Sequence, residues 1–77
     1  MSIEEKVLEI VGTHFLVHYD INVDDNFITD LKGDELDNME ICMLIESEFN
    51  VEIIDADMEE INTAQGYIDY LKNEGVE

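Results

Sequence analysis

Few residues of the sequence are candidates for a catalytic role. Its single cysteine, Cys42, falls among apolar residues at helical spacing, which is typical of an inert core thiol rather than a reactive one. Glu35 could in principle act as a general acid or base, but no second catalytic residue type lies close to it in the sequence. The histidines, His14 and His18, are both far from it along the chain. We therefore expect no catalytic residues and no enzymatic activity.

Carboxylates are abundant, and two stretches group them closely. These stretches are Asp24-Asp25 and the segment that holds Asp55, Asp57, Glu59 and Glu60. Such groups could attract divalent cations weakly, but neither has the ligand pattern of a calcium-binding loop. We expect screening ions there and no metal site.

The charge balance restricts the class of partner. Three Lys and Arg residues stand against 21 Asp and Glu, which gives a formal net charge of −18. Binding to a nucleic-acid backbone needs Lys and Arg, and anionic membranes repel an acidic protein, so both are disfavoured. The expected partner is a protein with a basic patch, although an acidic surface that only aids solubility is an open alternative.

Length and composition predict one domain over residues 1–77. The chain is 45% apolar and has no proline, four glycines and no Gly/Ser tract that could form a linker. One cysteine cannot form an internal disulfide, which favours a reducing compartment. Because residues 1–6 do not resemble a signal peptide and no apolar run is long enough to span a membrane, we expect a cytoplasmic protein, and a monomer.

The pattern of apolar residues predicts helices throughout. A capping box of Ser2 and Glu5 starts the first helix, which we expect to end near Val17. A long polar loop follows to Gly33. The residues expected to anchor this loop on the core are Val23, Phe27, Ile28 and Leu31.

The second helix is expected to begin at Asp34, with Asp37 at its third position, and to stop at Asn50. Its predicted apolar stripe consists of Leu36, Met39, Cys42, Met43, Ile45 and Phe49. An extended connector over 51–54 leads to a short helix from Asp55 or Asp57 to Ile61. The last helix, capped by Thr63, ends near Asn73 and turns Ala64, Tyr67, Ile68 and Leu71 inward. The predicted fold class is all-α, with three longer helices, one short third helix and a long first loop.

Residues 30–40 resemble the signature of the acyl carrier protein family. Leu31, Asp34, Leu36 and Asp37 stand in register with the family's Leu-Gly-x-Asp-Ser-Leu-Asp stretch, and Gly33 lies near its glycine. Residues 2–7, 46–53 and 61–71 are similar to other parts of the family, so the resemblance covers almost the whole chain. It implies the four-helix acyl-carrier-protein bundle and phosphopantetheine as the family cofactor.

The sequence departs from this family at Glu35, which occupies the position of the serine that carries phosphopantetheine. A transferase needs a hydroxyl oxygen there, whereas a carboxylate would give a labile mixed anhydride, so no cofactor is expected on this chain. Ser47 lies twelve residues further on, about 18 Å along a helix. Thr29 is in the preceding loop, and the other hydroxyl residues are not near the motif.

Two roles for Glu35 stay open at this point. A negative side chain in the first turn of a helix stabilises the helix by roughly 0.3–1 kcal/mol, which is the simpler role. Alternatively, its charge could imitate the phosphate of a loaded carrier.

The resemblance also implies a docking surface along the second helix and the turn after it. Its acidic positions are Asp34, Asp37, Glu40, Glu46, Glu52 and Asp55, and its apolar contacts are Leu36, Met43 and Ile53.

Three functions remain possible from the sequence. The first is an acidic docking module of carrier type that engages carrier-binding enzymes of fatty-acid or polyketide-type synthesis, or regulators, without delivering an acyl group. The second is an ordinary acyl carrier protein of fatty-acid biosynthesis seen as a serine-to-glutamate variant without its cofactor. The third is an acidic mimic of a nucleic acid.

Overall fold

The computed structural model describes residues 2–16 and 22–76, and for Asp55 its backbone alone. It contains four helices, α1 (Ile3–Phe15), α2 (Glu35–Phe49), α3 (Asp55–Glu60) and α4 (Ala64–Asn73). The described residues form no strand; Asn26 and Thr63 make one isolated bridge. The predicted all-α fold with a short third helix is therefore confirmed.

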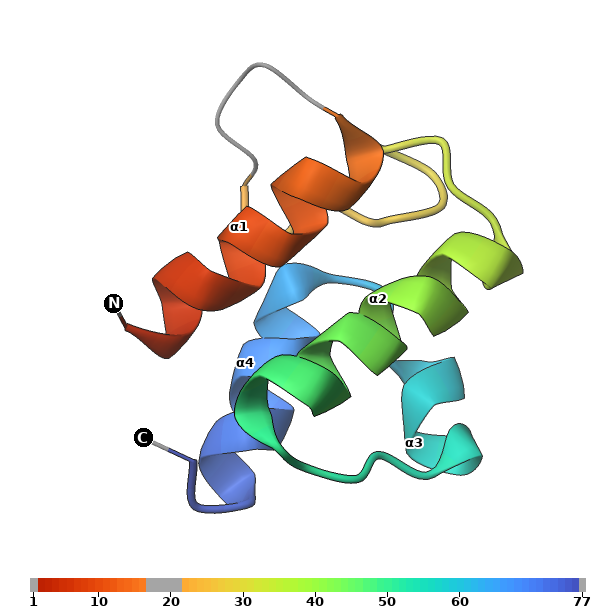
Figure 1. The fold of residues 1–77 in the computed structure, drawn as a ribbon. Coiled ribbons are helices and arrows are strands. Elements are labelled where there is room, and N and C mark those ends of the chain that lie inside the picture. Colours follow the sequence, from red (N-terminus) through yellow and green to blue (C-terminus); the bar gives the residue numbers. More distant parts are fainter. Residues whose placement is uncertain (1, 17–21, 77) are drawn as a thin grey trace.

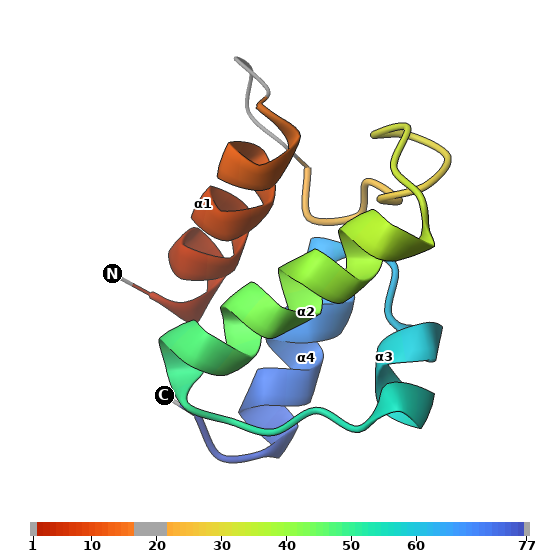
Figure 2. The same ribbon diagram turned by 45° about the vertical axis from the view of Figure 1, so that its right-hand side comes forward.

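Helix α1 packs against both α2 and α4, and α3 packs against α2 (Figures 1 and 2). Residues 22–34, which follow the undescribed residues 17–21, lead the chain to the start of α2 (Figure 1).

Side chains that cap the helices set their boundaries. Ser2 and Glu5 form the expected capping box of α1, and Thr63 accepts a hydrogen bond from the Gly66 N–H at the start of α4. Helix α2 ends at Phe49, with Asn50 in the left-handed conformation, as predicted. Helix α1 ends at Phe15, slightly earlier than expected, because Leu16 takes a left-handed conformation as its C-cap. Val17 and His18 lie outside the described residues.

The core lies between α1, α2 and α4 and contains the large aromatic residues. Phe27 and Tyr67 stack with their ring centroids 6.1 Å apart, and Phe15 packs on Phe27 from the side of α1. Phe49 is half-buried and packs against the buried residues of the core. Phe27 and Tyr67 are fully buried, which confirms that both belong to the core.

The predicted inner face of α2 was partly wrong. Leu36, Met39 and Met43 are 61%, 45% and 62% exposed, whereas Ile41, which the predicted stripe omitted, is fully buried beside Cys42 and Ile45. Apolar residues occupy nearly every side of this helix, so periodicity alone could not select a face. Packing against the neighbouring helices selects which face of α2 is buried. Ile28, expected to anchor the first loop, is likewise 41% exposed, while Phe27 next to it is buried.

Gly66 is required by close packing against the residue that ends α3. A Cβ atom at this position would lie 2.9 Å from Cγ2 of Ile61. The close contact explains a glycine inside α4, where it otherwise costs about 1 kcal/mol relative to alanine.

Candidate functional site

The first turn of α2 presents a group of carboxylates. Glu35 is the first helical residue and is exposed. Asp34, the N-cap, accepts a hydrogen bond from the Asp37 N–H at 3.0 Å, and Asp37 accepts one from the Asp34 N–H at 3.0 Å. This reciprocal capping fixes the backbone on both sides of Glu35.

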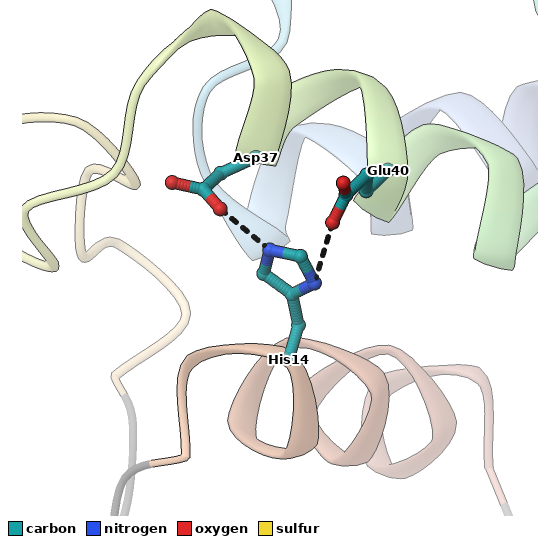
Figure 3. Close-up of side chains that lie close together, drawn as sticks. All are labelled: His14, Asp37 and Glu40. Atoms are coloured by element: carbon teal, nitrogen blue, oxygen red, sulfur yellow. Dashed lines mark hydrogen bonds and ion pairs between the residues drawn. The ribbon is translucent and has the colours of Figure 1, made fainter.

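His14 joins this turn to α1. Its Nε2 lies 2.8 Å from Oδ1 of Asp37 and its Nδ1 lies 3.7 Å from Oε2 of Glu40, so the ring stands between two carboxylates of α2 (Figure 3). The His14 side chain is only 12% exposed. The hydrogen bond from His14, together with the one from the Asp34 N–H, lowers the pKa of Asp37.

Sequence reasoning missed this cluster because His14 and Asp37 are 23 residues apart and no local pattern links them. The ligand atoms of His14, Asp37 and Glu40 lie within 4.8 Å of one another, a set that a divalent cation could use. A cation bound there would have to displace the His14–Asp37 hydrogen bond. We therefore assign the cluster to the contact between α1 and α2.

A cleft of about 530 Å³ opens beside Glu35, between α2 and α3. Its lining residues are Ile28, Glu35, Asn38, Met39, Met58, Glu59 and Asn62. Asn38 is 8% exposed; its Nδ2 donates to the Met58 carbonyl at 3.4 Å, while its Oδ1 is buried without a hydrogen-bond partner. No pattern in the sequence indicates that this residue faces inward.

The acidic docking positions differ in how far they are exposed and in what they contact. Asp34, Glu40 and Glu52 are exposed, and Asp37 is half-buried in its contact with His14. Glu46 is also half-buried, and it accepts a hydrogen bond from the Ile53 N–H at 2.8 Å, which holds the chain that leaves α2. Asp55 lies at the start of α3.

Among the apolar docking positions, Leu36 and Met43 are exposed, whereas Ile53 is not. Ile53 is 6% exposed and belongs to the core, whereas its neighbour Ile54 is 60% exposed. The alternation of an extended segment turns one of the two inward, and the sequence offered no way to choose. Leu44, also missed, is 47% exposed and forms a shallow groove with Glu40 and Met43.

The few basic residues of the chain do not balance the negative charge of α2. Lys6 pairs with Glu48 at 3.8 Å and Lys72 pairs with Glu4 at 2.6 Å, and the second pair lowers the pKa of Glu4. Helix α2 itself contains no Lys or Arg. Its outer face therefore combines exposed apolar side chains with an excess of negative charge.

Neither the thiol nor the hydroxyl nearest in sequence to Glu35 stands in for an attachment serine. Cys42 is buried, and Ser47 is exposed but lies near the opposite end of α2. Thr29 is exposed in the loop before the helix. Residue 35 carries a carboxylate and no hydroxyl, so it does not fit a phosphopantetheine group that is attached through a serine.

Comparison with known proteins identifies the family. A family model described as "Phosphopantetheine attachment site" matches residues 5–71. The chain belongs to this family of acyl carrier proteins. The fold is also similar to that of a solved Mycobacterium tuberculosis chain described as an acyl carrier protein, with a TM-score of 0.82 and 20% identity over 88% of this chain and 92% of that chain.

Membership of the acyl carrier protein family accounts for the helix order and the long first loop. The family and its fold are those of carriers that interact with partner proteins and do not themselves catalyse reactions. Within the described residues, no helix has the length and apolar character needed to cross a membrane.

Proposed function

We propose that this chain is an acidic docking module of the acyl carrier protein family that carries no phosphopantetheine and engages carrier-binding proteins without delivering an acyl group. The observation that supports it is the exposed carboxylate of Glu35 at the start of an intact, doubly capped α2. The partners we propose are enzymes of fatty-acid or polyketide-type synthesis, or their regulators. We place the protein in the cytoplasm as a monomeric single domain.

The absence of loading follows from chemistry at position 35. Attachment requires an oxygen nucleophile that leaves a stable phosphodiester, and a carboxylate would instead form a mixed anhydride that water cleaves. Glu35 adds a negative charge where a loaded carrier has its phosphate, so Arg or Lys side chains of a partner could still recognise it.

Docking is supported by the character of the outer face of α2. Leu36 and Met43 present apolar surface next to Asp34 and Glu40, and the helix has no basic residue to offset these charges. Each exposed ion pair with a partner contributes only about 0–1 kcal/mol, but several together steer association in a salt-dependent way. The exposed apolar side chains favour a protein partner over mimicry of a nucleic acid.

Competition for a carrier-binding enzyme tests the docking proposal. The chain is titrated against a complex of a carrier transferase with an ordinary acyl carrier protein, at low and high salt. We expect displacement that weakens as salt rises and is reduced by Glu40→Gln but not by Glu9→Gln, which removes an exposed charge from α1. No displacement at low salt would contradict docking.

The intact start of α2 also supports a second candidate function. Asp34, Leu36 and Asp37 keep the family pattern around position 35, as they would in an ordinary carrier whose serine had been replaced. The genomic codon decides between the two proposals. A serine codon at position 35 favours the ordinary carrier, and a glutamate codon rejects it.

A further inference from the structure

The sulfur atoms of the described residues divide into an exposed set and a buried one. Met39 and Met43 are 45% and 62% exposed and lie one helical turn apart on the same side of α2. Met58 of α3 is half-buried, whereas Cys42 is buried. Because access governs how fast sulfur is oxidised, an oxidant in solution reaches the thioethers on α2 before it reaches the Cys42 thiol.

Met43 lies where a change of polarity affects docking. It forms a shallow groove with Glu40 and Leu44, and neither of these neighbours has a side-chain N–H or O–H donor. A sulfoxide oxygen on Met43 would therefore be hydrated by water in the free chain. A partner that covers this groove would have to remove that water, and burying a polar group without a hydrogen bond is unfavourable.

We propose that Met43 is a site of reversible oxidation by hydrogen peroxide, and that its conversion to the sulfoxide weakens docking. This inference rests on the proposed docking function and adds a means of regulating it. The thioether sulfur attacks one peroxide oxygen, so that an S–O bond forms as the O–O bond breaks. The leaving hydroxide takes the proton of the transferred hydroxyl and departs as water. The sulfur is oxidised and the peroxide is reduced.

The positions of the methionines allow oxidation without loss of the fold. Among the described residues, the buried core contains no methionine. The side chains that cap α2 and join it to α1 are Asp34, Asp37 and His14, and none of them contains sulfur. Oxidation of Met43 therefore changes the outer face of α2 while the contacts that hold this helix remain. The exposed sulfoxide is also open to methionine sulfoxide reductases, which makes the change reversible.

Peptide mass mapping after brief treatment with hydrogen peroxide tests the site. Cleavage after glutamate places Met39, Met43 and Met58 in separate peptides, 36–40, 41–46 and 53–59. We expect the sulfoxide to form first at Met43, next at Met39 and last at Met58, with Cys42 still open to alkylation once the chain is unfolded. Oxidation of Met58 or Cys42 ahead of Met43 would overturn the assignment.

The effect on docking is measured as displacement of an acyl carrier protein from a carrier transferase. Oxidation should weaken displacement by the native chain about fivefold or more, and repair with methionine sulfoxide reductases should restore it. Circular dichroism of the oxidised chain should still show its helices. A loss that repair does not restore, or that accompanies unfolding, would overturn the proposal.

Two leucine variants show which methionine is responsible. Each variant is compared with its own untreated form, so that any change in its basal docking cancels. Met43→Leu should lose much less displacement on oxidation than the native chain, while Met58→Leu should lose as much as the native chain. Equal losses in the two variants would overturn Met43 as the site. If Met43→Leu docks too weakly to compare, the repair of the native chain and the peptide map decide.

The outcome can be told apart from failure of the docking proposal. A chain that displaces the acyl carrier protein equally well before and after oxidation of Met43 overturns the regulatory site alone. A chain that does not displace it even when fully reduced overturns both proposals.

Discussion

Nε2 of His14 lies 2.8 Å from Oδ1 of Asp37, and this contact ties the last turn of α1 to the first turn of α2. Asp37 also closes the capping box with Asp34 through its other carboxylate oxygen. One side chain therefore caps α2 and connects it to α1. Because Glu35 lies between Asp34 and Asp37, the presentation of Glu35 depends on this pair of contacts.

The His14–Asp37 contact predicts how stability changes in acid. The pKa of Asp37 is lowered by its hydrogen bonds from His14 and from the Asp34 N–H, so its contribution is fully present above the ordinary value of 3.8 and is lost as the pH falls through the lowered value. We expect Asp37→Asn to be less stable than the native chain near neutrality, with a difference that shrinks in acid. Urea unfolding over a pH series measures this. A difference that grows below the ordinary Asp pKa would contradict it.

Leu36 is exposed and Ile53 is buried, so replacing each by alanine should change the stability by different amounts. Leu36→Ala removes an exposed side chain and should change the free energy of unfolding by less than about 0.5 kcal/mol. Ile53→Ala removes a core side chain and should cost about 2–5 kcal/mol. Chemical denaturation compares the two, and docking should be impaired by the first while the protein stays folded. Comparable stability losses would show that the faces are misassigned.

In the variant Gly66→Ala, helix propensity and packing should change the stability in opposite directions. Alanine favours a helix by about 1 kcal/mol, but its Cβ would meet Cγ2 of Ile61 at 2.9 Å, and overpacking typically costs about 1–3 kcal/mol. We expect net destabilisation in thermal unfolding. Ile61→Leu, which removes the methyl branch at Cβ, should reduce that loss in the double variant. An increase in Tm for Gly66→Ala alone would contradict the close packing.

Salt should stabilise this protein. Three Lys and Arg residues against 21 Asp and Glu cause self-repulsion that added ions screen, and the two exposed ion pairs of Lys6 and Lys72 are too weak to reverse the effect. We expect Tm to rise between low salt and about 0.5 M sodium chloride. A fall in Tm would indicate that the ion pairs outweigh the repulsion.

The features that the sequence predicted well depend on neighbouring residues. The capping boxes of Ser2 with Glu5 and of Asp34 with Asp37 act over three residues, so the helix starts could be read directly. The single apolar face of α4 predicts that Tyr67 and Leu71 lie in the core, where both are fully buried. Local chemistry decides each of these features.

The features that the sequence did not predict depend on contacts between distant segments. The buried side of α2 at Ile41 is selected by packing against the other helices, since apolar residues surround the helix. The His14–Asp37 pair spans 23 residues, and the inward turn of Ile53 is set by the hydrogen bond from its N–H to Glu46. Asn38 at the cleft belongs to this group as well.

Intact-mass spectrometry shows whether this chain, which we propose docks as a carrier, can be loaded with phosphopantetheine. The chain is incubated with coenzyme A and a carrier transferase of known activity, beside its Glu35→Ser variant. We predict no gain in mass for the native chain and a gain of one phosphopantetheine group for the serine variant, because the start of α2 is otherwise intact. A gain of one phosphopantetheine group on the native chain would contradict the claim.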